Sequence, residues 1–254
     1  MIYYQAIKHQ ECLRTGSFES IIGTKGQRHK LCALANLAKY LNRYSQFKEQ
    51  MHNAGLHWNN NDSAFKGFLS IFSKNHNDVP KYLEDIWTAL NWNEQIFVKF
   101  LAITGLRAGE GIDSFNLIIE LNDKGRLGEY YNKESCVLEH FKYKELFLRK
   151  TKNTFISFVS PQFIEEICNA SPVNYNIIQC RLKRLNKSLR FKELRSFNNT
   201  FIRKHNVLGE LVDILAGRVP KSVFVRHYLG ADMDELSKQV LMIQESLVEV
   251  LFGF

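Results

Sequence analysis

The segment NEQIFVKFLAITGLRAGE, residues 93–110, decides the fold class of this 254-residue chain. From Asn93 to Leu106 its apolar residues form one continuous helical side. We expect the helix to end at Gly105, because glycine readily adopts the left-handed conformation that closes helices. An arginine and a carboxylate, Arg107 and Glu110, follow three residues apart on one side of the next helical turn. The segment therefore predicts a buried helix that presents an arginine and its carboxylate partner beyond its end, although a surface ion pair would have the same pattern.

Helical patterns lie on both sides of this segment. From Arg28 the leucines recur at helical spacing, and other helical stretches cover residues 63–73 and 80–90. The composition of Asn53–Asp62 is that of a loop, and turn-forming residues precede Pro80. We place a domain boundary there, between a helical domain at residues 1–76 and a second domain at residues 77–254.

The pattern changes only between Phe141 and Pro161. Residues 141–150 and 154–160 alternate or run with aromatic and β-branched side chains, and Thr151–Asn153 between them suits a tight turn. Helical patterns resume after Pro161 and continue to the end of the chain. The predicted fold class is therefore mainly α with a small β-hairpin or sheet (α+β).

Composition excludes several classes of protein. No apolar run approaches the ~18 residues that a membrane span needs, and the N-terminal residues lack the features of a signal peptide, so we expect a cytoplasmic protein. The five cysteines are scattered and form no CxxC pair, so a disulfide framework or zinc ribbon is not expected.

Positive charge is concentrated in one region of the sequence. Residues 141–228 carry 17 Lys/Arg against 6 Asp/Glu, an excess of 11 within a chain of net charge +8. This concentration of charge suits a polyanion such as DNA, although a solvated basic face is about equally compatible with it.

Further basic motifs follow in this region. Lys192 and Arg195 are three residues apart and share one helix face, and Gly217 precedes Arg218 as Gly105 precedes the first arginine motif. Ten residues later comes Tyr228. Two lysines, Lys150 and Lys152, lie at the predicted hairpin turn.

This order of motifs resembles the tyrosine recombinase (site-specific integrase) family, from about residue 80 to 230. The family usually has HxxR and then GH or GW where this chain has KELR and GR, and Lys192 and Arg218 make it most similar to integrases of archaeal viruses and plasmids. The resemblance implies a helical DNA core-binding domain at 1–76 and a catalytic domain at 77–254. In the first domain, the basic residues expected to contact double-stranded DNA are Arg28, Lys30, Lys39 and Arg43.

The resemblance also implies a mechanism that uses no metal or cofactor. Tyr228 would attack the scissile phosphorus and form a covalent 3′-phosphotyrosyl link. Arg107 and Arg195 would clamp the phosphate oxygens with Glu110 in support, and Arg218 and Lys192 would complete the cationic cage. Lys150 would protonate the 5′-oxygen leaving group, with Lys152 as the alternative, and the acceptor of the tyrosine proton stays open. In agreement, the sequence contains no HExxH motif, acidic cluster or Cys/His site.

The C-terminal segment, residues 232–254, is predicted to be a helix that begins at an Asp232 N-cap and carries an apolar stripe. It either folds back on its own domain or docks on a neighbouring protomer, since the family assembles as tetramers on DNA. Two other functions compete with the recombinase: a DNA-binding protein of this type without catalysis, and a topoisomerase IB-like or relaxase-like enzyme that rejoins the same strands.

Overall fold

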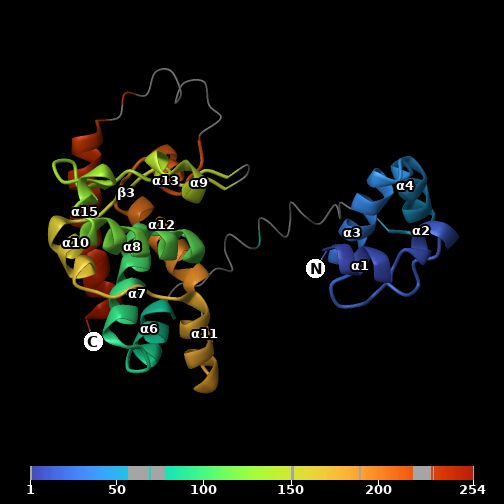
Figure 1. Cartoon of the computed structure of the whole chain (residues 1–254), viewed down its shortest axis with the longest axis horizontal. Helices are drawn as coiled ribbons and strands as arrows, with labels where there is room; N and C mark the ends of the chain where they lie inside the picture. Colours follow the sequence, from blue (N-terminus) through green and yellow to red (C-terminus); the bar gives the residue numbers. More distant parts are fainter. Residues whose placement is uncertain are drawn as a thin grey trace. The chain divides into compact units, whose positions relative to one another are not determined.

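The computed structural model describes residues 2–56, 69, 78–149, 152–188, 190–219, 230 and 232–253. The chain divides into two compact units, Met1–Lys74 and Asn75–Phe254. Both are helical in their described parts, and the second adds a small antiparallel sheet. This confirms the predicted fold class (Figure 1). The predicted boundary after residue 76 and, apart from Leu69, the predicted helix at 63–73 lie outside the described residues.

The first unit is a small helical cluster with its own apolar core. The predicted leucine helix forms: Leu31 and Leu34 are buried, whereas Leu41 lies beyond the helix end and is exposed. Phe18 and Phe47 meet edge to face with ring centroids 6.0 Å apart and complete the core. The helices before and after the leucine helix were not predicted, because they are short or weakly patterned. The elements are α1 (Ile2–Lys8), α2 (Glu11–Thr15), α3 (Gln27–Tyr40) and α4 (Tyr44–Asn53).

The second unit is organised around one buried helix, α7 (Trp92–Thr104), as the sequence predicts. It begins with a capping box between Asn91 and Glu94 and ends at Gly105, whose φ of 62° is left-handed. Helices α8, α10, α12 and α15 all pack against it. The other helices of this unit are α6 (Val79–Trp87), α8 (Ala108–Asp123), α9 (Lys144–Phe147), α10 (Pro161–Cys168), α11 (Tyr175–Arg184), α12 (Phe191–Lys204), α13 (Gly209–Leu215) and α15 (Met233–Phe252), with 3-10 turns η1 (Leu127–Glu129) and η2 (His140–Lys142).

The sheet differs from the predicted hairpin. Three short antiparallel strands, β1 (Tyr131–Asn132), β2 (Val137–Leu138) and β3 (Ser157–Phe158), lie in sequential order. Of the predicted first strand at 141–150, residues 141–147 instead form most of η2 and then α9, so that part of the prediction is wrong. Among the described residues of the predicted hairpin, Leu148 and Asn153 pair as an isolated antiparallel bridge.

The reason for this difference is the burial of Tyr130. The rings of His140, Tyr143 and Phe147 pack around the Tyr130 ring at centroid distances of 5.6, 5.2 and 6.1 Å. These three residues are spaced three and four apart, which is a helical period. The alternation of aromatic and charged residues in the sequence concealed this spacing.

The C-terminal helix α15 packs on its own unit. Asp232 is the N-cap, and its side chain accepts hydrogen bonds from the backbone N–H groups of Asp234 and Glu235. The apolar stripe is buried against α6, α7, α12 and β3, except for Val250, which is exposed. Among the described residues, no helix is long and apolar enough to cross a membrane.

A buried polar network ties the sheet to α8. Tyr130 Oη lies 2.9 Å from Ser114 Oγ and 2.6 Å from His140 Nδ1, and His140 Nε2 lies 2.9 Å from Ser157 Oγ. Complete burial lowers the pKa of His140 from 6.5 to about 3. The imidazole is therefore neutral in the folded protein at physiological pH, whereas it protonates near pH 6.5 in the unfolded chain.

Replacing His140 should change how stability depends on pH. Between pH 6.5 and 3 the unfolded chain binds one more proton at this residue, so the parent protein should lose about 2 kcal/mol between pH 7.5 and pH 5 from this group. His140→Gln keeps hydrogen-bonding groups but cannot titrate, and denaturant unfolding at both pH values should show a smaller loss. His29→Gln, at an exposed histidine of α3, should lose as much as the parent. Equal losses in all three proteins would contradict the buried neutral imidazole.

Candidate active site

The loop after α7 carries the first arginine. Gly105 turns the chain, and Arg107 is the N-cap residue of α8. Arg107 Nη1 donates to Glu110 Oε1 at 2.7 Å, and the Glu110 side chain is only 2% exposed. The second carboxylate oxygen of Glu110 is buried without a hydrogen-bond partner among the described residues. The partly exposed guanidinium of Arg107 is thus held in place by the buried carboxylate of Glu110.

The tight turn between residues 148 and 153 meets this arginine. Arg149 N donates to Lys152 O at 3.3 Å within the turn. Arg107 Nη1 lies 3.4 Å from the carbonyl oxygen of Asn153, at the base of the turn. The described end of this turn, with Lys152 and Asn153, is therefore held next to Arg107.

Arg195, on the second turn of α12, joins two separate loops. Its Nη1 donates to Gly105 O and its Nη2 to Ala216 O, both at 2.7 Å. The first carbonyl belongs to the loop that leads to Arg107, and the second precedes Gly217 and Arg218. One guanidinium thus fixes the loops of both other arginines. A guanidinium has five N–H donors, and the remaining three have no hydrogen-bond partner among the described residues.

Gly217 allows the loop after α13 to approach the tight turn. Its φ of 69° is left-handed, and a Cβ placed on it would lie 1.7 Å from Asn153 O. Only glycine fits both conditions. The backbone at residues 216–218 is consequently held between Arg195 and the turn.

Arg218 extends from this loop toward solvent. Its side chain is 71% exposed, and its Nη1 contacts Asp213 Oδ1 on α13 at 3.0 Å. Sequence reasoning missed Asp213, because an aspartate five residues before an arginine is a common surface pattern. An exposed ion pair of this kind is weak, so Arg218 exchanges this partner for another anion at little cost.

The arginines affect one another electrostatically. Burial lowers the pKa of Arg195 to about 10, and the nearby positive charges of Arg107 and Arg218 contribute to the same shift, while Glu110 opposes it. Arg195 is still cationic at neutral pH. A cluster of mutually repelling cations of this kind is stabilised when an anion binds between them.

A buried amide that the sequence did not reveal supports the site. Asn198 Nδ2 donates to the carbonyls of Ala102 and Ile103 at 2.8 and 2.9 Å. These carbonyls belong to the last turn of α7, where no following helical N–H can satisfy them. Asn198 is three residues after Arg195 on the same helix, so both side chains hold the end of α7 against α12.

The remaining predicted site residues fall into three groups. Lys192 is exposed on the first turn of α12, one turn before Arg195, and Lys152 is exposed at the tight turn. Lys150 and Tyr228 lie outside the described residues. In the first unit, Arg28, Lys39 and Arg43 are exposed, whereas Lys30 is half-buried and donates to Thr24 Oγ1 at 2.8 Å.

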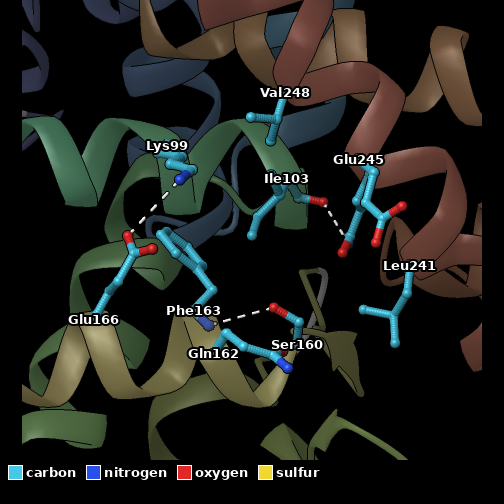
Figure 2. Close-up of a pocket in the computed structure, with 10 residues that line it drawn as sticks. Lys99, Ile103, Ser160, Gln162, Phe163, Glu166, Leu241, Glu245 and Val248 are labelled. Atoms are coloured by element: carbon cyan, nitrogen blue, oxygen red, sulfur yellow. Dashed lines mark hydrogen bonds and ion pairs between the residues drawn. The ribbon is translucent and has the colours of Figure 1, made fainter.

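The described residues form no candidate metal centre, and one cavity that they line lies away from the arginines. No three His, Cys, Asp or Glu side chains in the described part of the chain lie together as metal ligands. A cavity of about 460 Å³ lies between α7, α10 and α15 (Figure 2), and none of its lining residues is a predicted site residue.

Gly217→Ala tests whether the loop after α13 lies against the turn. Gly125→Ala is the matched control, since Gly125 also has a left-handed φ, of 65°, but nothing lies within 4 Å of its Cβ position. Both variants bear the cost of the left-handed conformation, and only Gly217→Ala must also displace Asn153. Thermal or denaturant unfolding should show an additional loss of about 2 kcal/mol for Gly217→Ala. Equal losses in the two variants would show that the two segments are not in contact.

Comparison with known proteins identifies the family of the chain. No curated protein and no solved structure matches the chain significantly. The model of the archaeal phage integrase family matches residues 83–240, which is more than half of the chain and includes every motif of the site. The resemblance to integrases of archaeal viruses is thereby confirmed, and the chain belongs to the archaeal phage integrase family.

Proposed function

We propose that the protein is a site-specific tyrosine recombinase that cuts and rejoins double-stranded DNA through a covalent 3′-phosphotyrosyl intermediate on Tyr228. The observation that supports this most is that Arg195 bonds both the loop that leads to Arg107 and the loop that leads to Arg218, and that the charges of these two arginines act on it. The three arginines come from separate parts of the sequence. Their planar donors match the oxygens of a phosphodiester.

In the first step the phenolic oxygen of Tyr228 attacks the scissile phosphorus. The bond from phosphorus to the 5′-oxygen breaks, and the phenol loses its proton to an acceptor that is not assigned. The leaving 5′-oxygen takes a proton from Lys150 or, alternatively, Lys152. In the second step a 5′-hydroxyl of the partner strand attacks the phosphotyrosine and releases Tyr228. One phosphodiester is thus exchanged for another, and no external energy source is needed.

The arginines stabilise the negative charge that accumulates on the nonbridging oxygens during both steps. Arg195 has three N–H donors that no described residue binds, and Arg107 is oriented by Glu110. Lys192 is exposed and cationic, which suits a phosphate contact on the same helix face as Arg195. Because the arginines supply the positive charge, the proposed reaction needs no metal ion.

Binding of DNA requires a larger surface than the cage. The basic stretch at 141–228 would contact the phosphates around the cleavage site, and Arg28, Lys30, Lys39 and Arg43 would contact DNA from the first unit. Such binding should weaken steeply with salt. Exchange between two duplexes needs four active sites, so we also propose assembly into a tetramer on DNA.

Tyr228→Phe tests the nucleophile. The variant keeps the aromatic ring, so its affinity for DNA should be unchanged, while covalent adduct with a nicked suicide substrate should be lost. The parent protein should form adduct in excess chelator, as resolved on a denaturing gel. A parent that binds DNA without forming adduct would be a DNA-binding protein, and one that relaxes DNA but does not exchange two duplexes would be a topoisomerase-like enzyme. Either result would contradict the proposal.

Alanine variants of Arg195 and Arg218 should separate their two roles. Both should reduce the adduct-forming rate by about 100-fold or more. Arg195→Ala should also lower the free energy of unfolding by about 1–3 kcal/mol, because two buried carbonyls lose their donor, whereas the exposed Arg218 should matter less than about 0.5 kcal/mol. Arg126→Ala, at an exposed arginine paired with Glu129, is the control and should cleave like the parent. If both Arg195→Ala and Arg218→Ala cleaved DNA at the parental rate, the proposed role of these arginines in stabilising the phosphate would be wrong.

A further inference from the structure

The C-terminal helix α15 reaches the scaffold of the arginine cluster through one side chain. Gln244 is buried, and its amide nitrogen donates to Ile103 O at 2.9 Å and to Phe158 O at 3.0 Å. Both hydrogens of a single amide group are thus used on carbonyls of two different elements, α7 and β3. No sequence motif had identified this residue.

Both carbonyls lie close along the chain to the parts of the site. Ile103 is two residues before Gly105, whose carbonyl binds Arg195, and four residues before Arg107. Phe158 lies on β3, the edge strand of the sheet, five residues after Asn153 at the base of the tight turn. The relative position of these two elements determines the distance between the arginine loop and the turn. Gln244 bonds to both of them.

We propose that Gln244 is a positioning residue, through which α15 holds the Arg107 loop and the segment from Lys152 to Phe158 in the geometry that cleavage requires. This inference rests on the proposed strand-cleavage function. Gln244 itself touches no reacting atom. It acts because the phosphate clamp and the leaving-group acid come from two elements whose separation must be fixed to within a fraction of an ångström.

The surroundings of Gln244 indicate that removing its amide would leave the fold intact. Gln244 lines the cavity of about 460 Å³ between α7, α10 and α15, whose other lining residues include Ile103 and Leu241 (Figure 2). Without the amide, Ile103 O would keep its hydrogen bond from Asn198 Nδ2, and water that enters this space could satisfy Phe158 O. The helix also keeps its buried apolar contacts through Val240, Leu247 and Leu251. These replacements would satisfy the carbonyls, but they would not connect them to α15.

The test compares Gln244→Ala and Gln244→Met with the parent and with Gln239→Ala. Methionine retains most of the volume of glutamine without a donor, and Gln239 is a half-buried glutamine five residues earlier on the same helix. Single-turnover formation of covalent adduct is measured with a suicide DNA duplex at saturating protein, together with the Kd for the same duplex. We expect both Gln244 variants to form adduct at least 10-fold more slowly than the parent, with Kd values within 2-fold. Gln239→Ala should match the parent in both measurements.

Each result is decisive. Parental rates in both folded Gln244 variants, or a loss explained by weaker DNA binding, would overturn the inference, as would failure of both variants to fold. Absence of adduct in the parent would instead refute the proposed function. Hydrogen exchange in the two variants gives a second criterion: amides at 104–108 and 152–158 should exchange faster than in the parent, whereas those of α11 should not.

Discussion

The arrangement of the site depends on the two hydrogen bonds that Arg195 donates to Gly105 O and Ala216 O. Burying a guanidinium is costly unless its donors are satisfied. Two carbonyls at turns provide acceptors here, and in return the cation holds together loops that are more than 100 residues apart in the sequence. The interaction therefore stabilises the fold and assembles the cationic cluster at once. Burial is the main cause of the lowered pKa of Arg195, and the electrostatic cost of placing it near Arg107 and Arg218 adds to it.

The electrostatic repulsion among the three arginines also makes the cluster suited to bind an anion. The repulsion between neighbouring guanidinium groups exists before any ligand arrives, so a phosphate that enters between them relieves it. The charge that develops in a phosphoryl-transfer transition state would relieve it further, and donors already fixed in place need little reorganisation. Buried amides on α12 and α15, Asn198 and Gln244, supply rigidity by satisfying the last carbonyls of α7.

The parts of this account that were predictable from sequence depend on local patterns. The helix that ends at Gly105 was predictable because one apolar face and one glycine determine it. The order of basic motifs indicated the family, and the family match covers them all. The contacts of Asn198 and Gln244 were not predictable, because each depends on a partner far away in the sequence. The segment 141–147 was misread as a strand because the burial of Tyr130, and not local propensity, determines its conformation.

The most direct test of the central claim is to identify the residue that becomes attached to DNA. The covalent complex formed with a suicide duplex is digested with protease and nuclease, and the peptide that carries the remaining nucleotide is sequenced by mass spectrometry. The account predicts a single site of modification, on Tyr228, in the segment that follows Arg218. A nucleotide attached to any other residue would contradict it, even if the arginine cluster proved essential for cleavage.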